Sequence, residues 1–106
     1  MNEVELGSGN IFEDLGVSQP EEKLLKTKLI VAIVSILESK NLTQVESAEV
    51  LGLTQNKVSD LKNGKIKGFS VEKLFALLNK LNRDIDIRIR LAPKKQGQGT
   101  IHLVAA

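Results

Sequence analysis

The sequence contains no cysteine, tryptophan or tyrosine, and its 106 residues include one histidine and three phenylalanines. The absence of cysteine excludes disulfide bonds and thiolate metal sites, and a single histidine, His102, excludes a zinc site built from several histidines. Because aromatic side chains are few, the core must consist of leucine, isoleucine and valine. We assign no metal role to His102 and expect it to be structural or exposed.

Long apolar runs and targeting signals are missing as well. No run approaches the ~20 residues that a membrane-spanning helix needs, and the N-terminus lacks the basic and apolar regions of a secretory signal. No nucleophile stands with a base, and Asp84 and Asp86 are too isolated to form a catalytic carboxylate pair. We therefore expect a cytoplasmic protein without membrane contact, enzymatic activity or cofactor, in a chain long enough for one domain.

Acidic and basic residues are separated along the chain. Residues 1–22 carry six acidic side chains and no basic one, whereas residues 23–106 carry 15 basic and seven acidic ones, so a net charge of −6 precedes one of +8. Residues 1–17 lack sustained periodicity, and we interpret them as an irregular acidic arm. An acidic arm on a basic body fits a body that binds polyanions, and it fits a solvated surface with an acidic tail equally well.

Apolar residues at helical spacing predict four helices between residues 18 and 82. The first follows a capping box formed by Ser18 and Glu21, and its apolar stripe is wider than one core face requires. Asn41 follows its end. The N-caps and helix-ending glycines expected after it are Thr43, Gly52, Thr54, Gly64 and Ser70. The side chains expected to face inward are Leu25, Leu29, Ile33 and Leu37, then Val45, Ala48 and Leu51, then Val58 and Leu61, and last Val71, Leu74, Phe75, Leu78 and Leu81.

The periodicity changes after residue 82, where four apolar residues alternate with charged ones. This alternation predicts a half-buried strand, and residues 100–104 form a second, weaker candidate. A lone strand cannot satisfy its own backbone groups, so we expect pairing with residues 100–104 or with the same strand of a second subunit. We favour the second arrangement, in which residues 83–106 are a dimerisation element. The apolar residues at this expected interface are Ile85, Ile87, Ile89 and Leu91.

The segment from Leu42 to Lys65 meets the steric demands of a helix-turn-helix. Ala48 places a small residue where the two helices cross, and Gly52 provides the positive φ that the turn requires. Val58 and Leu61 give the second helix one narrow apolar stripe. Its other side chains are polar, as entry into a DNA groove requires, and they are Gln55, Asn56, Lys57, Ser59, Asp60 and Lys62.

This segment closely resembles the phage repressor/Cro-like helix-turn-helix, also called the XRE class. The resemblance covers about residues 24–81, and the expected fold is mainly α. It is a four- to five-helix repressor-like domain at residues 18–82, followed by a C-terminal β-strand or hairpin. The arm from Ser8 to Gly16 and the alternating strand resemble the subgroup of HigA-type antitoxins. The residues that match the main pattern are Gln44, Ala48, Gly52, Leu53, Gln55, Val58, Leu61, Asn63 and Gly64.

The resemblance implies which residues touch DNA bases. Gln55 and Asn56, at the start of the second helix of the motif, match positions that contact base edges, and Asp60 matches a base-facing position. We add Ser59 because it lies on the same polar surface. A carboxylate departs from the neutral or basic residue usual at the position of Asp60. It would be repelled by phosphate but could accept a hydrogen bond from a cytosine amino group.

Phosphate contacts are implied in the same way for Gln44, before the turn, and for Asn63 and Lys65, after the second helix. The amide of Gln44 lies at a helix N-terminus, which suits an anion. Position and charge add Thr54, Lys57, Lys62 and Lys67 to this set. Arg88 and Arg90 are more typical of solvated or acid-paired side chains than of DNA contacts.

These features predict a bacterial, sequence-specific transcriptional regulator at the nucleoid. It would bind a palindromic operator in double-stranded DNA as a homodimer, because one helix reads only a few base pairs. Bound near a promoter, it would repress transcription, including that of its own gene. The alternative is an antitoxin that neutralises a small basic ribonuclease toxin by direct binding and regulates its own gene. RNA binding is a weaker interpretation, because no tyrosine or tryptophan offers a stacking platform.

Overall fold

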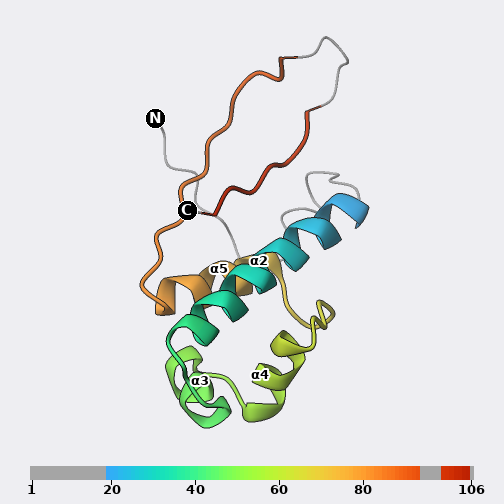
Figure 1. The fold of residues 1–106 in the computed structure, drawn as a ribbon. Coiled ribbons are helices and arrows are strands. Elements are labelled where there is room, and N and C mark those ends of the chain that lie inside the picture. The colour runs from blue at the N-terminus through green and yellow to red at the C-terminus, as the bar shows by residue number, and fades with distance from the viewer. Residues whose placement is uncertain (1–18, 94–98, 106) are drawn as a thin grey trace.

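The structure, a computed structural model, describes residues 19–93 and 99–105. In these residues the chain forms the helices α2 (Gln19–Ser39), α3 (Gln44–Leu51), α4 (Gln55–Lys62) and α5 (Val71–Lys80). The long α2 lies beside α5, and the short α3 and α4 pack on each other and on this pair (Figure 1). These helices confirm the expected helical domain, whereas Ser18 and the acidic arm at residues 1–17 lie outside the described residues. None of the four has the length and apolarity needed to cross a membrane.

The apolar stripe of α2 forms the centre of the fold. Leu25, Leu29, Ile33 and Leu37 recur every four residues and so share one face, and each is at most 7% exposed. This face packs mainly against α5, whose own inward leucines are buried. Burying one such side chain contributes about 1.5–3 kcal/mol. Short helices such as α3 and α4 are not stable alone, and burial of this kind stabilises them within the fold.

The core differs from the predicted stripes in two details. On α3, Val45 is 50% exposed, and the buried residues are Ser47, Ala48 and Leu51. On α5, Leu77 is fully buried although we did not expect it there. Both helices touch more than one neighbour. Which side chains of such a helix are buried depends on where its neighbours lie. One stripe of apolar residues in the sequence therefore does not define the buried set.

Side-chain caps set the start of each short helix. The Thr43 hydroxyl accepts from the Glu46 N–H at 3.1 Å, and the Glu46 carboxylate accepts from the Thr43 N–H at 2.9 Å, which confirms the predicted capping box. The bond from the Thr43 backbone, and then that from its side chain, hold the pKa of Glu46 below its ordinary value, because they favour the charged form. Thr54 and Ser70 cap α4 and α5 by accepting from the N–H three residues on.

The predicted C-terminal β-strand or hairpin is wrong. Within the described chain, residues 83–92 and 99–105 contain no strand, and beyond Arg83 they make no backbone–backbone hydrogen bond. Figure 1 shows this part as an open trace that leaves α5 and returns toward α2. A strand exists only where a second backbone supplies its ladder, and these two stretches do not pair with each other. The alternating sequence was therefore insufficient to predict a strand.

The apolar residues of this segment are also less buried than a half-buried strand requires. Ile85 packs on the helical core. Ile87, Ile89 and Leu91 are 55%, 82% and 94% exposed. We expected a second strand to cover these side chains, and the described part of the chain contains none.

Candidate nucleic-acid interface

The helix-turn-helix predicted between Leu42 and Lys65 forms as α3, a tight turn and α4. Gly52 adopts φ 66, and its N–H points back to the carbonyls of Ala48 and Glu49. The next N–H, that of Leu53, donates to the Ala48 carbonyl at 3.0 Å. These bonds satisfy the free carbonyls at the end of α3 and reverse the chain, so that α4 packs directly against α3.

A side chain from α5 completes this turn. The Lys80 ammonium donates to the Leu51 carbonyl at 3.1 Å. A cation at a helix C-terminus is favoured by the helix dipole and satisfies a carbonyl that has no partner within the helix. The contact joins residues that are 29 positions apart. Lys80 was not among the predicted site residues. Its only signal in the sequence was its place in the last turn of α5, where lysine is common because the dipole of that same helix favours a cation.

The polar side of α4 faces solvent. Val58 and Leu61 are 0% exposed, so they point the opposite side of the helix outward. The four predicted base-contacting residues lie next to one another on that outward side. Gln55 and Asn56 are exposed, and Ser59 and Asp60, one turn later, are half-buried.

Hydrogen bonds order the edges of this surface. The Gln44 amide donates to the Gln55 carbonyl at 3.1 Å, which ties the first turn of α3 to that of α4. Among the described residues the second amide proton of Gln44 has no acceptor, so it can donate to a ligand. The Asn63 amide donates to the Ser59 hydroxyl at 3.3 Å, and the Thr54 hydroxyl, which accepts within the helix, retains its own proton for donation. A surface that is ordered in advance loses less conformational freedom when it binds a ligand.

The four lysines predicted to contact phosphate lie around α4 in different environments. Lys62 and Lys67 are exposed and form no ion pair within the described part of the chain. The Lys65 ammonium lies 3.7 Å from the Asp60 carboxylate. Two residues with separate predicted roles, one toward phosphate and one toward bases, are therefore brought together as an ion pair.

Lys57 is held against the loop between α4 and α5. Its ammonium lies 5.0 Å from the centroid of the Phe69 ring, a distance at which a cation–π interaction is favourable. Gly68, at φ 95, leaves room for it, because a Cβ there would lie 3.1 Å from the Lys57 nitrogen. Phe69, which is 3% exposed and lies outside the four helices, was not among the residues predicted from the sequence.

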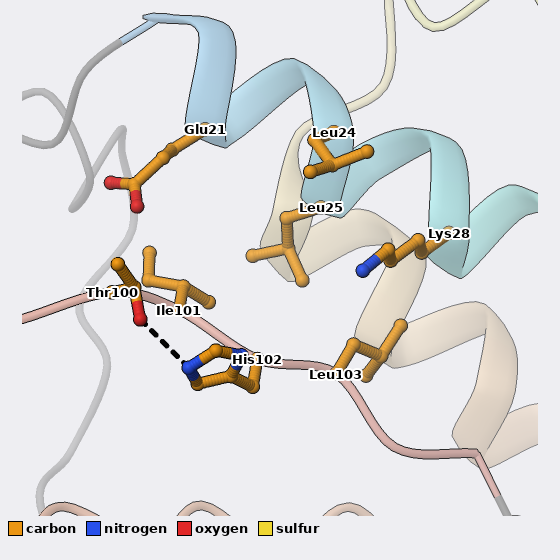
Figure 2. Close-up of a pocket in the computed structure, with 8 residues that line it drawn as sticks. All are labelled: Glu21, Leu24, Leu25, Lys28, Thr100, Ile101, His102 and Leu103. Atoms are coloured by element: carbon orange, nitrogen blue, oxygen red, sulfur yellow. Dashed lines mark hydrogen bonds between the residues drawn. The ribbon is translucent and has the colours of Figure 1, made fainter.

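The remaining candidates lie apart from α3 and α4. Arg88 and Arg90 are exposed in the segment after α5. His102 and Thr100 share a hydrogen bond of 2.7 Å beside a cavity of about 250 Å³ (Figure 2). Residues from the first half of α2 and from the C-terminal segment line this cavity, and no residue of α3 or α4 does. The cavity marks where the chain packs back on α2, and we give it no part in the interface.

Known proteins show the same architecture. A family model described as a helix-turn-helix domain matches residues 11–90. The chain is also similar to a solved structure of a protein assigned to the XRE family of transcriptional regulators, with a TM-score of 0.80 and 40% sequence identity over 84% of this chain and 100% of that one. No match was found among curated proteins. The chain therefore belongs to the helix-turn-helix domain family described by that model and to the XRE family.

Proposed function

We propose that the protein is a sequence-specific DNA-binding regulator of transcription that inserts α4 into the major groove. The observation that carries the proposal is the outward side of α4. Gln55, Asn56, Ser59 and Asp60 lie there side by side, while Val58 and Leu61 anchor the opposite side in the core. The major groove is wide enough to admit one helix and displays a different pattern of donors and acceptors for each base pair. Membership of the XRE family supports this proposal.

The side chains at the start of α4 have the chemistry to read bases. Gln55 and Asn56 each carry a donor and an acceptor, and such amides pair bidentately with adenine. Phosphates would lie around this helix, against the amide of Gln44 and the hydroxyl of Thr54, at helix N-termini that attract anions. The exposed Lys62 and Lys67 would supply the binding energy that depends on salt.

Gln55→Ala tests base reading directly. Truncation removes the amide without touching the core, so we expect binding to the preferred operator to weaken by about 1–3 kcal/mol and binding to scrambled DNA to stay nearly constant. The operator is first selected by the wild-type protein from random duplexes. Fluorescence anisotropy titrations on the selected and scrambled duplexes then measure both affinities.

Two further variants calibrate this measurement. Lys62→Ala is expected to weaken binding to both duplexes alike and to lower the slope of log affinity against log salt by about one. Ser35→Ala, on the exposed side of α2, should change neither. An equal loss on both duplexes for Gln55→Ala would remove this residue from the base contacts. A wild-type protein that selects no sequence would overturn the proposed function.

We propose further that the protein binds a palindromic operator as a homodimer and acts as a repressor, including of its own gene. Two copies of α4 about 34 Å apart would occupy successive major grooves, whereas one helix reads too few base pairs for specificity. Support comes from Ile87, Ile89 and Leu91, which are 55–94% exposed. Large apolar side chains exposed this close together in the sequence, unlike scattered single ones, favour an interaction surface. Ile85, which packs on its own core, is the least available of the predicted interface residues.

Ile89→Ser combined with Leu91→Ser tests the dimer. Neither side chain touches the helical core, so we expect an unchanged helical signal, a monomer at micromolar concentration and an affinity for the full palindrome that falls to that for a half-site. Light scattering and anisotropy measure the two effects. Val31→Ser, which removes an apolar side chain 60% exposed on α2, should leave the dimer intact. A monomeric wild type, or a doubly substituted protein that stays dimeric, would refute this interface.

The alternative function is that of an antitoxin. Six acidic and no basic residues within residues 1–22 suit a basic partner such as a small ribonuclease, and the resemblance to HigA-type antitoxins is consistent with it. Both functions are compatible in one chain. A neighbouring gene for a short basic protein would support the antitoxin, and the lack of one would argue against it.

A further inference from the structure

The outward side of α4 carries one acidic residue at a place where DNA phosphates would repel it. Asp60 is the single acidic residue of α4, and it follows Asn56 by one turn, so the two share a side. An uncompensated carboxylate there would oppose the approach of any DNA sequence. The Lys65 ammonium compensates the negative charge of Asp60, because it lies 3.7 Å from the Asp60 carboxylate. The Lys65 side chain is 66% exposed and that of Asp60 is 34% exposed.

The loop after α4 holds Lys65 in this place. Gly64 adopts φ 70 and turns the chain back. The Lys65 N–H then donates to the Asp60 carbonyl at 2.9 Å. This main-chain bond is that of a helix C-terminal motif. The side chain of Lys65 is directed to the same residue, Asp60. The neighbouring Lys62 and Lys67 have no ion-pair partner among the described residues.

We propose that Asp60 and Lys65 act as a neutral pair that selects cytosine at the base pair that α4 presents to Asp60. This inference rests on the proposed binding of α4 in the major groove. An ionised carboxylate only accepts hydrogen bonds. Cytosine offers only a donor in the major groove, guanine and thymine offer acceptors, and adenine sets an acceptor beside its donor. Asp60 therefore attracts cytosine and is repelled by the acceptors of the other bases.

Lys65 makes this selection compatible with tight binding. Its charge brings the net charge of the pair to zero, so Asp60 adds no repulsion from phosphates. The pair is weak while both groups are in water and strengthens when DNA displaces that water, because the effective dielectric constant falls. The carboxylate keeps further lone pairs for the base. Lys65 is a positioning and charge-compensating residue in this arrangement, and it acts through Asp60.

A double-mutant cycle on the full-length protein tests the pair. Wild type, Asp60→Asn, Lys65→Met and the double variant are titrated against the operator selected by the wild type and against its single-base variants. We expect Lys65→Met to weaken operator binding about tenfold when Asp60 is present and about twofold in the Asp60→Asn background, because only the first leaves an uncompensated carboxylate. Asp60→Asn should shift one position from cytosine toward adenine, which suits an amide.

Matched controls separate this role from simple phosphate contact. Lys62→Met, which removes an unpaired lysine of the same surface, should cost the same in both backgrounds. Thermal melts establish that each variant is folded. Equal losses for Lys65→Met in both backgrounds, with a salt slope lower by about one, would overturn the pair and leave Lys65 as a phosphate contact. Unchanged base preferences for Asp60→Asn would overturn it too. A wild type that selects no sequence would instead refute the proposed function on which the pair rests.

Discussion

Leu61→Ala is expected to lower the free energy of unfolding by about 2–5 kcal/mol, the usual cost of a cavity left by a buried leucine. Leu61 is 0% exposed, and it shares with Val58 the inward side of a helix that has only eight residues. A helix of that length is not stable alone, so its packing determines whether it forms. We expect the variant to lose affinity for all DNA, because the orientation of α4 is no longer fixed. Urea denaturation followed by circular dichroism measures the stability.

The neighbouring residue provides the control for this variant. Lys62→Ala changes an exposed side chain of the same helix, and its stability should stay within about 0.5 kcal/mol of wild type. Leu61→Met conserves most of the volume and should cost less than about 1.5 kcal/mol. If the Leu61→Ala protein unfolds at the same urea concentration as the wild type, α4 is held in place by something other than its inward side chains.

Gly52→Ala is expected to destabilise the protein by about 2–3 kcal/mol, through two separate effects. A Cβ at φ 66 costs about 1–2 kcal/mol because the left-handed conformation is unfavourable for alanine. The same Cβ would lie 2.8 Å from the Lys80 nitrogen. That flexible side chain would move away and give up its bond to the Leu51 carbonyl, at a further cost of about 1 kcal/mol.

Gly64→Ala is the matched comparison. Gly64 adopts φ 70 but has nothing within 4 Å of the added Cβ, so this variant should show the conformational cost alone. The difference of about 1 kcal/mol between the two alanine variants should vanish when Lys80→Met is introduced into both. Urea denaturation of the four proteins measures this. Equal costs while Lys80 is present would show that its bond to α3 contributes nothing to the turn.

The sequence was sufficient to predict where the interface lies, but it was not sufficient to predict which groups of the interface contact one another. The helix-turn-helix segment was recognised because Ala48, Gly52, Val58 and Leu61 must stand at set spacings for two helices to cross and one to face outward. The structure places the predicted base-contacting residues together on that outward side. It also shows Lys65 paired with Asp60. Individual roles toward bases and phosphates remain predictions, because the partner that defines them is DNA.

The sequence by itself determined the four helices, the caps of α3, α4 and α5, and the turn between α3 and α4. Each depends on groups within a few residues of one another, as in the capping box of Thr43 and Glu46 or the left-handed Gly52. Such local hydrogen bonds and backbone preferences are present in the sequence as residue types at fixed offsets. For the same reason, the residue types and spacings within residues 42–65 are sufficient to carry the family resemblance.

Only the tertiary structure decided which distant groups meet. Residues 85–91 alternate as a strand does, yet the strand did not form, because a ladder needs a second backbone and alternation does not say whether one is near. Lys80 reaches the Leu51 carbonyl, and Lys57 lies over the Phe69 ring. Several lysines of this chain look alike in the sequence. What each one contacts depends on how the helices pack, since long side chains pair with whatever the fold brings within reach.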